Sequence, residues 1–114
     1  MAIDDFPHGG PVLVRVEHRL DSSNAHAFHE ELESATDTPR RAVVVDMDGL
    51  AYISSAGLRV IMQVVRKTQR QGGSLALCSL SQDVRAVFET SGFDQIIDIH
   101  PSRAEAVSAI ATRA

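Results

Sequence analysis

Residues 43–58, VVVDMDGLAYISSAGL, determine how the rest of the chain is interpreted. The stretch begins with three β-branched valines, which favour a buried strand, and then turns acidic at Asp46 and Asp48. After a short apolar segment it reaches Ser54 and Ser55, which suit the start of a helix. A strand therefore carries two hydroxyl groups to a helix N-terminus, where free N–H groups and the positive end of the helix dipole favour a phosphate, as ligand or as modification.

The composition indicates one globular domain. The 114 residues suffice for a single hydrophobic core, and the 44% hydrophobic and 23% charged content is usual for a soluble protein. The net charge of −4 argues against nucleic acid as a partner, and the single Cys78 excludes an internal disulfide. Because no apolar run reaches transmembrane length and the N-terminus does not resemble a secretory signal, we expect a cytoplasmic protein without membrane insertion.

Hydrophobic periodicity divides the chain into alternating strands and helices. After an irregular lead over residues 1–11, strands are expected at 12–20, 43–46, 74–80 and 95–99. Helices are expected at roughly 23–35 and 56–71, between Ser81 and Gly92, and after Ser102. This order predicts a single α/β domain over residues 1–114, with a mostly parallel sheet of four to five strands and right-handed crossovers.

Two polar segments, residues 21–24 and 46–57, follow strands and precede helices. In parallel sheets, sites collect where strand C-termini meet helix N-termini. We therefore expect one edge of the sheet to be functional, with the carboxylates of Asp21, Asp46 and Asp48 close together there.

Several segments of the chain resemble the STAS domain family, whose small bacterial members are anti-sigma factor antagonists. The similar segments are YISSAGLRVI at residues 52–61, the GGSLALC that begins at Gly72, SGF at residues 91–93 and, in part, LDSSNA at residues 20–25. The resemblance extends from about Val12 to the C-terminus. It implies an α/β STAS fold and a protein that acts by binding other proteins, with no enzymatic activity, cofactor or metal of its own.

The resemblance also implies a phosphorylation switch. In that family the antagonist binds an anti-sigma factor that is also a serine kinase, phosphorylation of a serine releases it, and a PP2C-type phosphatase restores binding. Aligning the family's Asp-Ser-Ser/Thr-Gly-Leu motif on Gly57 and Leu58 places Ser55 on the phosphorylated serine. Ser54 then replaces the usual acidic residue, and Ala56 replaces the Ser/Thr. The glycine that usually precedes the Leu-Asp pair is His18 or Arg19 here.

The expected partner surface surrounds Ser55. A phosphate adds roughly −1.5 to −2 of charge, which a helix N-terminus tolerates but a desolvated interface does not. We expect Gly57 to allow close approach of a partner, Val60 and Val64 to offer an apolar patch, and Arg59 to add a polar rim. The full expected partner-binding set is Asp21, Ser22, Ser54, Ala56, Gly57, Leu58, Arg59, Val60, Gln63 and Val64.

Other interpretations of these patterns stay open. Ser54 and Ser55 both suit helix capping, and the resemblance favours Ser54 as the cap. Val60 and Val64 fit ordinary packing against another helix as well as a partner surface. A STAS domain can also serve as an unphosphorylated scaffold subunit of a transport or signalling complex, such as the partner of a lipid-transport ATPase. The oligomeric state, the sigma factor and the pathway are left open.

Three chemical motifs are weaker. The run VVVDMDG resembles the nucleophile motif of haloacid-dehalogenase-type phosphohydrolases, but such an enzyme needs further Lys and acidic motifs and a longer chain. The acidic pair does not form a calcium loop, because Gly57 stands where the loop needs Glu. His26 and His29 have helical spacing without an evident third ligand, which favours a solvated helix face. Cys78 lies in an apolar strand and is expected in the core.

Overall fold

Five strands form one sheet in the order β1-β2-β3-β4-β5. The structure, a computed structural model, describes residues 2–5, 11–37 and 42–111. Its strands are β1 (Ala2–Asp5), β2 (Val12–Leu20), β3 (Ala42–Ile53), β4 (Ser74–Cys78) and β5 (Asp98–His100). Its helices are α1 (Ala25–Ala35), α2 (Ser55–Arg70), α3 (Gln82–Ser91), the short 3-10 helix η2 (Phe93–Gln95) and α4 (Arg103–Ala111).

Strands β2 to β5 are parallel and alternate with helices, which confirms the predicted α/β class. The expected irregular lead is wrong for Ala2–Asp5, because these residues pair antiparallel with β2 from Val12 to Arg15. Four residues show too little periodicity to identify a strand, and the pairing depends on the free edge that β2 offers. Residues 6–10 of the expected lead lie outside the described residues.

The central strand β3 is longer than predicted. It continues through the acidic segment to Ile53, because Met47, Leu50 and Ile53 are buried and keep the segment on the sheet. The register with β2 shifts at two places, between Arg15 and Glu17 and between His18 and Arg19. Such bulges absorb extra residues and increase the local twist of a strand. The C-terminal end of β3 is therefore at Ile53, and Asp46 lies in mid-strand.

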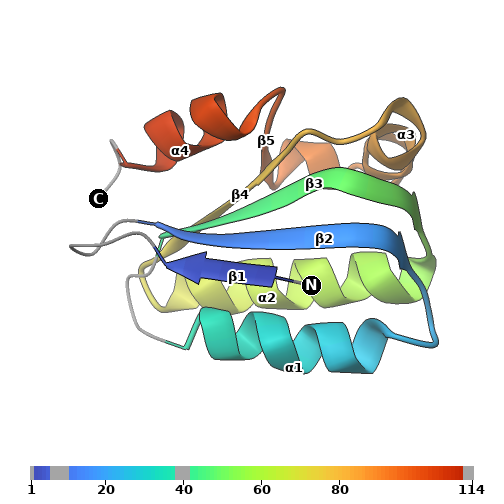
Figure 1. Cartoon of the computed structure of the whole chain (residues 1–114), viewed down its shortest axis with the longest axis horizontal. Helices are drawn as coiled ribbons and strands as arrows, with labels where there is room; N and C mark the ends of the chain where they lie inside the picture. The colour runs from blue at the N-terminus through green and yellow to red at the C-terminus, as the bar shows by residue number, and fades with distance from the viewer. Residues whose placement is uncertain (1, 6–10, 38–41, 112–114) are drawn as a thin grey trace.

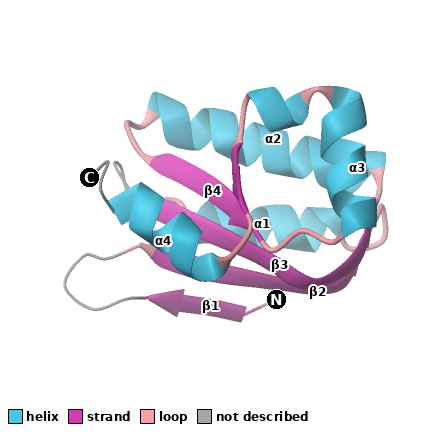
Figure 2. Ribbon diagram, turned by 90° about the horizontal axis from the view of Figure 1, so that it is seen from above, coloured by secondary structure: helices cyan, strands magenta, loops and turns pink. Residues whose placement is uncertain are grey.

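Helices cover both faces of the sheet. Figure 1 shows α1 and α2 together on one face and α4 on the other. Alternate residues of the strands point to the two sides: Val43, Val45 and Leu77 pack with α1 and α2, whereas Val44 and Cys78 pack under α4. The view in Figure 2 shows that β2, β3 and β4 run side by side between these layers. Because helices cover the central strands on both faces, the sequences of these strands are nearly continuously apolar.

Candidate functional site

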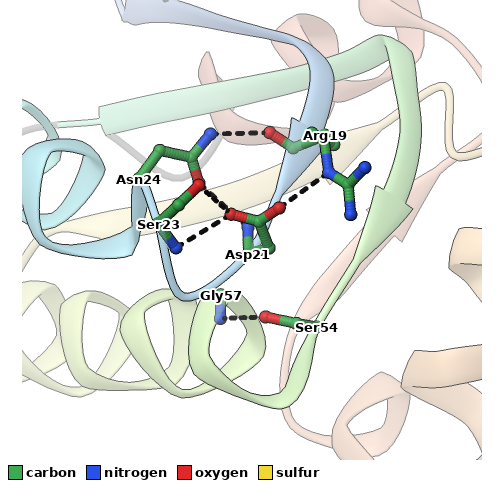
Figure 3. Close-up of polar contacts among 6 residues, drawn as sticks. All are labelled: Arg19, Asp21, Ser23, Asn24, Ser54 and Gly57. Carbon is green, nitrogen blue, oxygen red and sulfur yellow. Dashed lines mark hydrogen bonds and ion pairs between the residues drawn. The ribbon is translucent and has the colours of Figure 1, made fainter.

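The N-terminus of α2 is built by Ser54. Its backbone is extended (φ −91°, ψ 173°), and its Oγ accepts a hydrogen bond from the Gly57 N–H at 3.3 Å, which confirms Ser54 as the helix cap. The Ser54 N–H donates to the Leu20 carbonyl at 2.8 Å. This bond ties the end of β3 to the end of β2. The loop after β2 and the start of α2 thus lie next to each other, as Figure 3 shows.

Ser55, the next residue, is the first residue of α2 and is exposed. Ala56 is half-buried beside it, and Arg59 and Gln63 are exposed one and two turns further along the helix. Because the capping role falls to Ser54, the Ser55 hydroxyl is accessible and makes no hydrogen bond to any of the described residues. This arrangement allows a second protein to reach the side chain without disturbing the cap.

Gly57 has a different role from the one expected. A Cβ atom at this position would lie 2.7 Å from Cγ and 2.9 Å from Cδ2 of Leu20, and 3.2 Å from Cγ1 of Ile53. Gly57 itself is buried. The expectation that it admits a partner's backbone is therefore wrong: the glycine lets α2 approach the ends of β2 and β3 within the same chain.

The expectation that Val60 and Val64 form an exposed apolar patch is also wrong. Val60 is 8% exposed and Val64 is fully buried, and both belong to the core between the sheet and the helices on that face. Leu58 is likewise 8% exposed. The reason is that α2 contacts α1 as well as the sheet, so a second side of the helix is covered. The alternative of ordinary packing against a neighbouring helix is the correct one for these valines.

A groove of about 360 Å³ lies along the exposed side of α2 and begins at Ser55. Its lining residues come from α2 and from the start of η2: Ser55, Leu58, Arg59, Met62, Gln63, Arg66 and Phe93. Met62, Arg66 and Phe93 were not part of the expected surface. Helical periodicity accounts for the buried Met62 and the exposed Arg66, but no local pattern brings Phe93, which lies 27 residues after Arg66 in the sequence, to the same groove.

The loop between β2 and α1 forms the other side of the site (Figure 3). The Ser23 N–H donates to Asp21 Oδ1 at 2.9 Å, and Arg19 Nε donates to Asp21 Oδ2 at 2.7 Å. Hydrogen bonds from the Ser23 hydroxyl and N–H, with a further contribution from Arg19, hold the pKa of Asp21 below its usual value. The Asn24 side chain donates to the Arg19 carbonyl at 2.9 Å. Ser22 is exposed at the tip of this fixed loop.

The carboxylate of Asp46 lies elsewhere. Asp46 is buried on the α4 face, and its Oδ2 accepts hydrogen bonds from Arg103 Nε at 3.0 Å and Nη2 at 2.8 Å. The expectation that Asp46 joins Asp21 at one sheet edge is wrong, because β3 continues for seven residues beyond it. Exposed Asp48 lines a small cavity with Asp46 and Arg103, away from the α2 groove.

The remaining candidates have ordinary surroundings. His26 lies 3.0 Å from Glu30, and His29 lies 3.2 Å from Glu33, one turn along α1. Within the described part of the chain, no three His, Cys, Asp or Glu side chains are placed to hold a metal ion. Cys78 is buried in the core as expected, and burial raises the pKa of its thiol to about 11. None of the described helices combines the length and the apolar character that crossing a membrane requires.

Comparison with known proteins places this arrangement in one family. The STAS domain family matches residues 5–106. BtrV of Bordetella bronchiseptica, a proposed anti-sigma factor antagonist, is 40% identical over 103 residues, which cover 90% of this chain and 89% of BtrV.

Solved structures share the fold at lower sequence identity. A proposed anti-sigma factor antagonist from Thermotoga maritima has a TM-score of 0.87 at 20% identity, covering 96% of this chain and 93% of that one. The Bacillus cell fate determinant SpoIIAA in its phosphorylated form has a TM-score of 0.71 at 18% identity, covering 96% and 99%. With the family match over nearly its whole length, the protein belongs to the STAS domain family.

Proposed function

We propose that the protein is an anti-sigma factor antagonist that binds an anti-sigma factor with serine kinase activity. Phosphorylation of Ser55 releases this partner, and a PP2C-type phosphatase restores binding. The protein acts in the cytoplasm and is the substrate of the kinase, without a catalytic activity of its own. The observation that carries the proposal is the division of roles between two serines: Ser54 caps α2, whereas Ser55 is exposed beside it.

The comparisons support the same proposal. BtrV, at 40% identity, is named as an anti-sigma factor antagonist, and SpoIIAA, which shares the fold, has been solved in a phosphorylated form. The chain covers 89% of BtrV, so the comparison extends over most of that protein.

The contact surface that we propose is narrower than the sequence suggested. It consists of exposed or partly exposed residues at the junction of two loops and α2: Asp21, Ser22, Ser54, Ser55, Ala56, Arg59 and Gln63. The buried Gly57, Val60 and Val64 act indirectly, because they fix how α2 sits against the sheet. Leu58 is nearly buried but reaches the groove.

A phosphate on Ser55 is compatible with the fold and incompatible with docking. At the first residue of α2 the added charge lies at the positive end of the helix dipole, which favours it by about 0.3–1 kcal/mol. Inside an interface the same group loses its hydration, and this is costly unless a cation pairs with it. The switch therefore needs no rearrangement of the domain.

The test combines purified protein, the serine-kinase anti-sigma factor from the same genome, and ATP. We expect mass spectrometry to place the phosphate on Ser55. We expect Ser55→Ala to bind the partner in the presence of ATP, and Ser55→Glu to bind at least tenfold more weakly, a loss of about 1.4 kcal/mol or more. Ser34→Glu adds the same charge to an exposed position on α1 and serves as the control. Modification at another serine, or equal binding of the two Ser55 variants, would contradict the proposal.

A further inference from the structure

Three arginines on α2, Arg59, Arg66 and Arg70, differ from the other cationic side chains of the described structure, Lys67 of the same helix included. Several of the latter have a carboxylate within 4.0 Å: Arg19, Lys67, Arg85 and Arg103. Among the described residues, no such carboxylate lies near Arg59, Arg66 or Arg70. Spacings of seven and four residues place these three arginines on one face of the helix. An arginine face without acidic neighbours is notable in a chain whose net charge is −4.

The helix itself does not account for all three arginines. Arg70 lies in the last turn of α2, where a cation is favoured by the negative end of the helix dipole. Arg59 lies in the second turn, close to the positive end, and the first turn contains no acidic residue. Arg59 therefore gains little from its own helix. Together with the free N–H groups of the first turn, it makes this end of α2 electropositive.

Arg59 and Arg66 line the groove that begins at Ser55. Leu58 and Met62 are almost buried and Phe93 is partly buried, so the base of the groove is apolar. Its volume of about 360 Å³ suits a few side chains of a partner protein. The groove thus offers an apolar base between two guanidinium groups that have no other described partner.

We propose that this groove binds an acidic segment of the partner protein. Carboxylates of that segment pair with Arg59 and Arg66, and an apolar side chain between them contacts Leu58, Met62 and Phe93. Arginine suits this role because its planar guanidinium can pair with a carboxylate through two hydrogen bonds. This inference rests on the proposed function and adds to it the chemistry of the partner.

The same placement links docking to regulation. Ser55 and Arg59 are four residues apart in α2, so their side chains are neighbours on the helix surface. A phosphate on Ser55 pairs with Arg59 within the same chain. Phosphorylation then makes Arg59 unavailable to the partner's carboxylates. It also places a negative charge beside the partner's acidic segment.

The experiment measures the dissociation constant for the purified serine-kinase anti-sigma factor at two salt concentrations. We expect Arg59→Gln and Arg66→Gln each to weaken binding about two- to fivefold, and the double variant by on the order of tenfold. The salt dependence of the dissociation constant should be smaller for these variants than for the wild type, because salt screens exposed charge pairs and the variants have fewer of them. Arg66→Lys keeps the charge and should lose less than Arg66→Gln. Arg85→Gln, on α3, should bind like the wild type.

Each of the following outcomes would contradict this inference. Wild-type binding with no loss in the two arginine variants, whose folding is checked by thermal melting, overturns this inference and leaves the proposed function in place. No binding by the wild type overturns the proposed function and, with it, this inference. Concentration-dependent dimerisation that Arg66→Glu abolishes would identify a second copy of the chain as the occupant of the groove and overturn the proposal.

The proposed pairing of a Ser55 phosphate with Arg59 has its own test. Ser55→Glu should weaken partner binding by a smaller factor in the Arg59→Gln background than in the wild-type background.

Discussion

Gly57 shows how much a single missing side chain fixes in this molecule. A methyl group at that position would meet Leu20 and Ile53 at 2.7–3.2 Å, and Leu20 is 1% exposed, so its side chain has little room to move. The glycine therefore sets the distance between the start of α2 and the ends of β2 and β3. Its effect on the candidate site is indirect, through the position of the helix that carries Ser55.

We predict that Gly57→Ala destabilises the protein. Overpacking costs roughly 1–3 kcal/mol, and the better helix propensity of alanine returns up to about 1 kcal/mol. The free energy of unfolding in urea should fall by about 1–2 kcal/mol. Gly49→Ala is the matched control, because its added methyl would meet only the flexible, exposed side chain of Glu17 within 3.4 Å. Equal stability of both variants would show that α2 can shift freely.

Helix α2 combines a structural and an exposed serine at consecutive positions. Ser54 satisfies the Gly57 N–H, whereas Ser55 points to solvent at the mouth of the groove. Sequence propensity suits both residues equally to capping. The extended backbone of Ser54 and the hydrogen bond that its hydroxyl accepts assign the cap to Ser54, the residue that the family resemblance favoured. The same helix buries Val60 and Val64, which a helical wheel alone cannot assign to the core or to a partner.

We predict that Ser54→Ala lowers stability and Ser55→Ala does not. Loss of the cap should cost about 0.5–1 kcal/mol, in the lower part of the usual range because the hydrogen bond is long at 3.3 Å. The exposed Ser55 should change the free energy of unfolding by less than about 0.5 kcal/mol. Urea denaturation of the two variants compares them directly, and a larger loss for Ser55→Ala would reassign the cap.

Across the whole molecule, the two faces of the sheet differ in the polar features that they contain. The groove lies on the side of α1 and α2. On the face under α4, four residues of neighbouring strands lie in register and form a row: Arg15, Asp46, Cys78 and His100. The buried Asp46 carboxylate in this row binds Arg103 of α4. This ion pair anchors the last helix to the sheet and is remote from the groove.

We predict a measurable coupling between Asp46 and Arg103. Arg103→Met leaves a carboxylate that is 6% exposed without its cation, and a double-mutant cycle with Asp46→Asn should give a coupling free energy of roughly 1–3 kcal/mol. The surface pair Arg85 and Glu89, more than half exposed and 4.0 Å apart, is the control and should give less than about 0.5 kcal/mol. Similar coupling in both cycles would argue against an anchoring role.

Local patterns in the chain were enough to predict the order of the main strands and helices, the parallel sheet and Ser54 and Ser55 at the start of a helix. These features follow from periodicity and capping, which act over a few residues. Packing alone decided that Val60 and Val64 are core, that Asp46 faces α4, that Ala2–Asp5 forms a strand, and that Phe93 joins Arg59 and Arg66 at one groove. Each of these depends on which distant segment covers a side chain or pairs with a strand edge, and such contacts leave no signal in neighbouring residues.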